Sequence, residues 1–130
     1  RRLGIRLGRD LNASVGNPLP PARAFYWVKQ HHPQLAVPMA QVLLHAFWAE
    51  GRDLSTPEAV GAIALPAGLE AASVIAGAAS DEAATLLHNA VSASIQAGIF
   101  GSPTIVVDDE PFWGHDRLAD VEAWLSTGGW

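Results

Sequence analysis

Four residues in the last third of the chain have the types and spacing to hold a small peptide-like molecule. The stretch "GSPT" places Ser102 and Pro103 at the entrance to a predicted strand, and "WGHDR" places His115 and Asp116 just before a predicted helix. An X-Pro bond can be cis, and a cis bond here would turn the N–H and C=O of Ser102 outward to pair with an extended peptide. The alternative is a trans proline that only starts the strand.

Asp116 suits the binding of a zwitterion. The free amides at a helix N-terminus attract a carboxylate, and the carboxylate of Asp116 is suited to pairing with an ammonium group. The α-amino acid end of a peptide carries both charges. The alternative is that Asp116 only caps its own helix.

The composition excludes several other kinds of chemistry. The chain has no cysteine, so these residues hold no disulfide, thiolate metal site or CxxC motif. The five histidines lack the spacing of a helical metal site, and we expect no metal. A net charge of -5 argues against nucleic acid and anionic membrane partners. No apolar stretch approaches the ~20 residues of a membrane span.

The pattern of the chain divides it into three parts. Residues 1–21 are rich in turn formers and predict an irregular lead-in. Residues 22–97 have helical periodicity and predict a bundle, in which Ser55 or Thr56 caps a helix that begins at "PEAV". Residues 98–130 predict a β-hairpin followed by an amphipathic helix.

Two helix faces are predicted to be buried. In the last helix of the bundle the predicted inward stripe includes Val91 and Ile95. In the terminal helix the predicted stripe consists of four residues: Leu118, Val121, Trp124 and Leu125.

Other residues allow two interpretations. Trp48 could line an apolar ligand pocket, although an aromatic stripe on a helix is more often part of the core. Arg52 and Asp53 are expected in a solvated loop with local turn hydrogen bonds.

The last third of the chain, taken as a whole, resembles one protein family. The resemblance rests on "GIFGSPT", the β-branched strand after it, "DDEPFWGHDR" and the terminal helix. The segment is similar to the C-terminal part of 2-hydroxychromene-2-carboxylate isomerases and kappa-class glutathione transferases, which form the glutathione-dependent branch of the DsbA-like thioredoxin superfamily. "FWAEGRDLSTPEAV" resembles the helical insertion of those isomerases. The resemblance implies an α/β fold (an α+β fragment): a thioredoxin-like C-terminal β-hairpin and helix, with a DsbA-like all-helical insertion domain at 22–97.

The resemblance also implies roles for the residues above. Pro103 would be the cis-proline, Ser102 would present its backbone to the cysteinyl part of glutathione, and His115 and Asp116 would receive the γ-glutamyl end. His115 stands where the family more often has Gln or Ser. Trp48 is the candidate for substrate binding. The family's catalytic serine lies in an N-terminal strand–helix–strand portion that has no counterpart in this sequence, so the chain is expected to be part of a longer protein and its catalytic residue is unassigned.

The function implied by the resemblance is a glutathione-dependent isomerase of aromatic-compound catabolism, or a kappa-like glutathione transferase. In such an isomerase the glutathione thiolate adds to the substrate, permits bond rotation and leaves again. The expected partners are a small aromatic-derived substrate and a second copy in a homodimer, and the expected location is the cytoplasm. A thiol-disulfide oxidoreductase with an upstream CxxC and a non-catalytic thioredoxin-like binding module are the alternatives.

Overall fold

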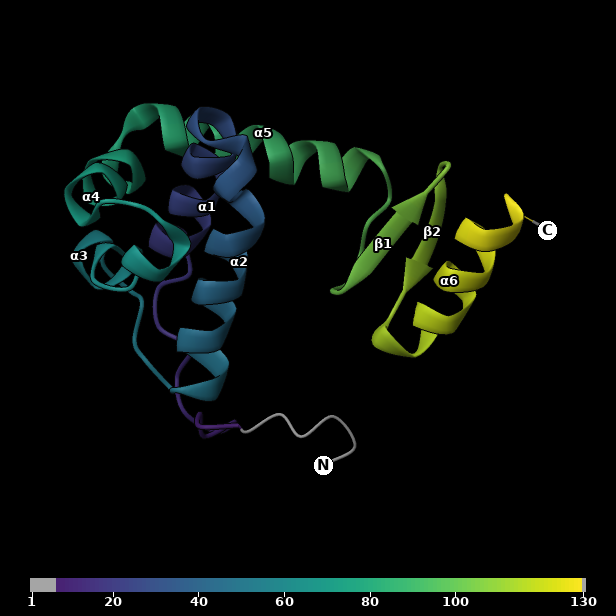
Figure 1. Cartoon of the computed structure of the whole chain (residues 1–130), viewed down its shortest axis with the longest axis horizontal. Helices are drawn as coiled ribbons and strands as arrows, with labels where there is room; N and C mark the ends of the chain where they lie inside the picture. The colour runs from purple at the N-terminus through teal and green to yellow at the C-terminus, as the bar shows by residue number, and fades with distance from the viewer. Residues whose placement is uncertain (1–6, 130) are drawn as a thin grey trace. The chain divides into compact units, whose positions relative to one another are not determined.

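The computed structural model describes residues 7–129, which form two compact units (Figure 1). The first unit ends at Ala90 and the second begins at Val91. The predicted domain boundary between residues 97 and 98 stays a prediction. None of the helices in residues 7–129 is long and apolar enough to cross a membrane.

Helices dominate the first unit, and the second combines a hairpin with a helix. The longer elements are α1 (Leu19–His31), α2 (Ala36–Leu44), α3 (Pro57–Gly61), α4 (Ala71–Ala79), α5 (Asp81–Gln96), β1 (Thr104–Val107), β2 (Glu110–Trp113) and α6 (Leu118–Thr127). The short helical turns are η1 (Pro33–Leu35), η2 (His45–Ala49), η3 (Leu65–Ala67) and η4 (His115–Arg117).

The predicted lead-in, 1–21, lies partly outside the described residues. Residues 7–18 are irregular, but α1 already begins at Leu19, inside the predicted lead-in. The prolines at 20 and 21 do not prevent this, because the N–H of a residue in the first helical turn has no intrahelical partner to lose.

In the first unit α1 packs against α2, α3 and α4 (Figure 1). Apolar side chains from these helices form one core, in which Val28, Met39, Val60 and Val74 are fully buried. Burying each such side chain contributes about 1.5–3 kcal/mol. The helical bundle predicted from the periodicity is therefore present.

Side-chain caps fix the starts of two helices in this unit. Thr56 caps α3, because its Oγ1 accepts a hydrogen bond of 3.2 Å from the N–H of Ala59, as the sequence predicted. Ser80 precedes α5, and its Oγ accepts a hydrogen bond of 3.1 Å from the N–H of Ala83. Each cap of this kind contributes about 1 kcal/mol to stability.

The predicted buried stripe of α5 is wrong in its second half. The side chains of Val91 and Ile95 are 49% and 69% exposed. They belong to the second unit, where the two strands pack against α6 and leave this end of α5 uncovered within the unit.

The second unit contains a two-stranded antiparallel hairpin with α6 against it (Figure 1). Thr104 pairs with Trp113, and Val107 pairs with Glu110. The two residues between the strands, Asp108 and Asp109, both have positive φ, as a tight hairpin turn requires. The predicted hairpin and terminal helix are both present.

The face that α6 buries is narrower than predicted. Phe112 is 2% exposed and Val121 is 8% exposed, and the ring of Phe112 meets that of Trp124 edge to face with centroids 5.8 Å apart. The indole Nε1 of Trp124 donates a hydrogen bond of 3.0 Å to Asp108, which ties the helix to the hairpin turn. Leu118 and Leu125 were predicted to be buried and are instead exposed, because a two-stranded sheet covers only the central part of the helix.

Candidate functional site

The structure brings four of the predicted site residues into one pocket of the second unit. Ser102 and Pro103 line one part of it, and His115 and Asp116 line another. The pocket has a volume of about 490 Å³ and is completed by Trp113, Gly114 and Arg117. Pockets of this size accept small organic ligands.

A backbone hydrogen bond joins the two segments of the pocket. The N–H of Gly114 donates to the carbonyl of Pro103 over 2.9 Å. The Ser102–Pro103 peptide bond is cis, as the sequence allowed. Within residues 7–129, the N–H and C=O of Ser102 make no hydrogen bond, so both are available to an extended ligand.

Trp113 forms a wall of this pocket and is held by close packing. Its indole lies so near Gly101 that a Cβ at position 101 would overlap the ring nitrogen. The ring of Phe100 lies 5.1 Å from that of Trp113, between centroids. Successive side chains of strand β2 point to opposite faces of the hairpin. Phe112 therefore faces α6, while Trp113 is 56% exposed on the other face.

The capping role considered for Asp116 is wrong. Asp116 lies inside η4, no side chain caps either η4 or α6, and the residue that precedes α6 is Arg117. The carboxylate instead turns back over Gly114, where an added Cβ would meet its Oδ1. The 3-10 turn places Asp116 two residues before the helix, which is why it cannot reach the helix amides.

The charges beside the pocket leave Asp116 free to receive a cation. Arg117 donates from Nε to Asp120 over 2.5 Å, so its charge is directed to its own helix. Within the described part of the chain, Asp116 makes no ion pair or side-chain hydrogen bond. An ammonium group in the pocket would find in Asp116 a carboxylate without a competing partner.

Trp48, the candidate substrate residue, lies in the first unit, in the π-helical turn η2. Its side chain is 42% exposed, and its ring meets that of Phe47 edge to face with centroids 4.9 Å apart. Its carbonyl accepts a hydrogen bond of 3.0 Å from the N–H of Gly8. The role of Trp48 in substrate binding stays a prediction.

The loop after η2 contains a carboxyl group with a shifted pKa. The hydroxyl and the N–H of Ser55 both donate to Asp53, and these two hydrogen bonds lower the pKa of the Asp53 carboxyl from 3.8; the charge of Arg9 acts in the same direction, while desolvation opposes them. The local turn hydrogen bonds predicted for this solvated loop are present for Asp53.

Sequence reasoning missed Trp113 and Arg117 as residues that line the pocket. The alternation of "EPFWG" along β2 could have found Trp113, because it places Trp113 on the face opposite Phe112. No comparable signal marked Arg117.

Comparison with known protein families identifies the family of this chain. The family described as "DSBA-like thioredoxin domain" matches residues 2–126, nearly the whole sequence. The chain belongs to this family. The predicted fold class, a DsbA-like thioredoxin fold with a helical insertion, is confirmed.

Two individual proteins are similar to this DsbA-like chain. The 2-hydroxychromene-2-carboxylate isomerase of Sphingobium xenophagum is 32% identical over 81 residues, which are 62% of this chain and 42% of that protein. A solved structure of a 2-hydroxychromene-2-carboxylate isomerase matches with a TM-score of 0.77 and 24% identity, over 95% of this chain and 58% of the other. The DsbA-like chain thus spans less than two thirds of the length of either relative.

Proposed function

We propose that the protein is a glutathione-dependent isomerase of the 2-hydroxychromene-2-carboxylate isomerase type, acting on a small aromatic-derived substrate. The observation that carries the proposal is one pocket with two complementary features. Ser102 offers an unpaired backbone N–H and C=O, and Asp116 offers a carboxylate without an ion-pair partner among residues 7–129. The similarity to the isomerase of Sphingobium xenophagum supports the choice of reaction.

The residues of the pocket fit glutathione. Its cysteinyl backbone would pair with the N–H and C=O of Ser102, as an added β-strand does. Its γ-glutamyl ammonium would pair with Asp116, and an N–H of the His115 ring would donate to the γ-glutamyl carboxylate. When bound, glutathione would supply the thiolate that adds reversibly to the substrate.

The roles of the chain's residues are binding and orientation. Trp113, held against Gly101, provides a rigid apolar wall beside the two polar positions. The hydrogen bond from Gly114 to Pro103 keeps the segments that carry Ser102 and Asp116 together. A ligand held at both ends in this way loses its freedom before the reaction, which lowers the entropic part of the barrier.

Two measurements test the proposal. Calorimetric titration with glutathione should give saturable binding, and the protein as its source cell makes it should isomerise 2-hydroxychromene-2-carboxylate only when glutathione is present. Absence of saturable binding would overturn the cofactor assignment. Binding without isomerisation would favour a binding module, and conjugation of glutathione to an aryl halide alone would favour a kappa-like transferase.

The expected homodimer belongs to the same proposal. Sedimentation equilibrium of the protein should give twice the chain mass. A monomer at all concentrations would contradict this part of the proposal and leave the glutathione pocket untouched, because all seven residues that line it come from one chain.

A further inference from the structure

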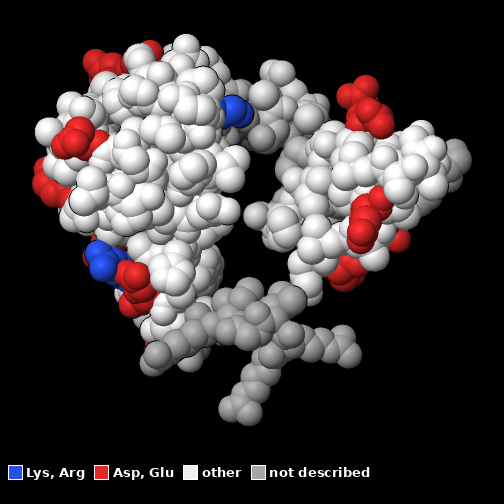
Figure 2. Space-filling view, in the orientation of Figure 1, with Lys and Arg blue, Asp and Glu red and all other residues white. Residues whose placement is uncertain are grey.

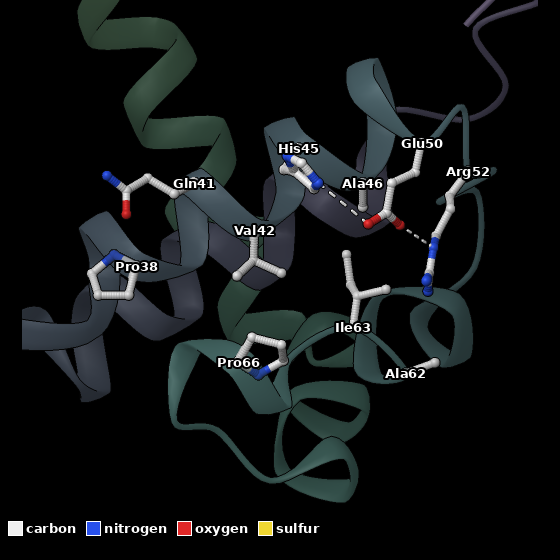
Figure 3. Close-up of a pocket in the computed structure, with 10 residues that line it drawn as sticks. All are labelled: Pro38, Gln41, Val42, His45, Ala46, Glu50, Arg52, Ala62, Ile63 and Pro66. Carbon is white, nitrogen blue, oxygen red and sulfur yellow. Dashed lines mark ion pairs between the residues drawn. The ribbon is translucent and has the colours of Figure 1, made fainter. Parts of the chain in front are cut away.

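The first unit contains an open cavity with an apolar wall and a charged end. Its volume is about 480 Å³, and it lies between the α2–η2 segment and the segment that follows α3 (Figure 3). Val42, Ile63 and Pro66 form the apolar wall. Figure 3 shows these three side chains close together, with Arg52 beyond Ile63.

A chain of three charged or titratable side chains forms the other end. Glu50 lies between His45, whose ring Nε2 is 3.4 Å from the carboxylate, and Arg52, whose Nε forms an ion pair with the carboxylate over 2.6 Å. The remaining side chains that line the cavity are uncharged. Figure 2 shows few basic side chains on the drawn face of the first unit, so this face carries no broad basic surface.

The backbone holds Arg52 in place before any ligand arrives. Gly51 has a φ of 69°, which reverses the chain after η2. The N–H of Arg52 then donates to the carbonyl of Ala46 over 2.9 Å, and the N–H of Glu50 donates to the carbonyl of His45 over 3.2 Å. The π-helical turn and Gly51 therefore place both charged side chains at the same edge of the cavity.

The guanidinium of Arg52 keeps part of its binding capacity. Only its Nε is used by Glu50, and among the described residues its two terminal nitrogens have no partner. In Figure 3 these nitrogens point toward Ala62, away from His45. Two adjacent N–H₂ groups of a guanidinium match the two oxygens of a carboxylate.

We propose that this cavity binds a small organic acid with a flat apolar body. The body lies on Val42, Ile63 and Pro66, and the carboxylate is held by the terminal nitrogens of Arg52. The inference does not rest on the proposed function, because every residue it uses lies between 38 and 66 and it involves no glutathione.

The test uses the 130-residue protein, with benzoate as the probe and benzyl alcohol as its uncharged counterpart. Two-dimensional amide NMR should show saturable shifts for Ala62 and Ile63 with benzoate, at a Kd at least about tenfold lower than that of benzyl alcohol. Equal Kd values for the two probes, no binding of benzoate, or shifts confined to other residues would overturn the inference.

Three variants make the test specific. Arg52→Gln should raise the Kd for benzoate about tenfold and leave that for benzyl alcohol unchanged. Lys29→Gln removes the same charge from α1, outside the cavity, and should change neither Kd. Ala62→Trp fills the cavity from an exposed position and should abolish the shifts with both probes. Unchanged benzoate binding in Arg52→Gln would overturn the inference.

Discussion

Gly114 donates a 2.9 Å backbone hydrogen bond to Pro103, across the pocket that contains Ser102 and Asp116. Residues 102 and 116 are separated along the chain by a complete hairpin, and this contact lies at the open end of its ladder, next to the pair Thr104–Trp113. The hairpin is therefore the element that converts two short motifs into one pocket.

The proposed role of Asp116 predicts a loss of binding without a loss of stability. Asp116→Asn should weaken glutathione binding about tenfold, because a charge-assisted hydrogen bond is replaced by a neutral one. The melting temperature should stay the same, because Asp116 does not cap α6. Calorimetric titration and thermal unfolding of the same samples measure both quantities.

The matched control is Glu122→Gln, which removes an equal charge from an exposed position of α6 outside the pocket. It should leave glutathione binding unchanged. If Asp116→Asn binds glutathione as the unchanged protein does, the assignment of Asp116 to the γ-glutamyl end is wrong.

The packing of Trp113 against Gly101 predicts a coupling between the two positions. Gly101→Ala should reduce the free energy of unfolding by about 1–3 kcal/mol, because the new methyl group overlaps the indole. In a Trp113→Leu background the same substitution should cost less, since the overlapping ring is gone. Urea unfolding of the four proteins in this cycle measures the coupling, and an equal cost in both backgrounds would show that the contact is unimportant.

The capping of α3 predicts a local loss of stability. Thr56→Ala should lower the free energy of unfolding by about 1 kcal/mol, because the N–H of Ala59 loses its hydrogen-bond acceptor. Thr56→Ser keeps the hydroxyl and should restore most of the loss. A Thr56→Ser protein as unstable as Thr56→Ala would exclude the cap as the cause.

The shifted pKa of Asp53 predicts an effect of pH on the first unit. Because the pKa is lowered in the folded protein, the ionised carboxylate stabilises the fold above the unfolded pKa, and this contribution is lost as the pH falls through the folded value. Ser55→Ala removes the largest cause of the shift and should raise the pKa of Asp53 toward 3.8. Side-chain carboxyl NMR over the acidic range measures it, with Thr56→Ala as the control that should leave it unchanged.

Much of the architecture was predictable because local signals and tertiary packing agree. Thr56, followed by a proline and an acidic residue, marked the start of α3, and the structure has the cap there. The β-branched run at 104–107 and the acidic pair at 108–109 marked the hairpin. The motifs at 102–103 and 115–116 identified the residues that meet in the pocket.

The wrong predictions concern residues whose burial or role depends on the neighbouring elements of the fold. Val91 and Ile95 have the spacing of a buried stripe, yet periodicity cannot tell which neighbour is there to cover it. Asp116 has the residue type of a cap, but η4 intervenes before α6 and takes it out of reach. Arg52 does lie in the exposed loop that the sequence predicted, and only the fold shows that this loop borders an apolar cavity.

The most direct test of the proposed function is to map glutathione on the protein by two-dimensional amide NMR, with cysteinylglycine as the control that lacks the γ-glutamyl group. The account predicts saturable shifts at residues 102–104 and 113–117 with glutathione, and shifts near Ser102 but none at Asp116 with cysteinylglycine. Shifts that do not saturate, or that avoid both segments, would contradict the glutathione pocket and with it the proposed function.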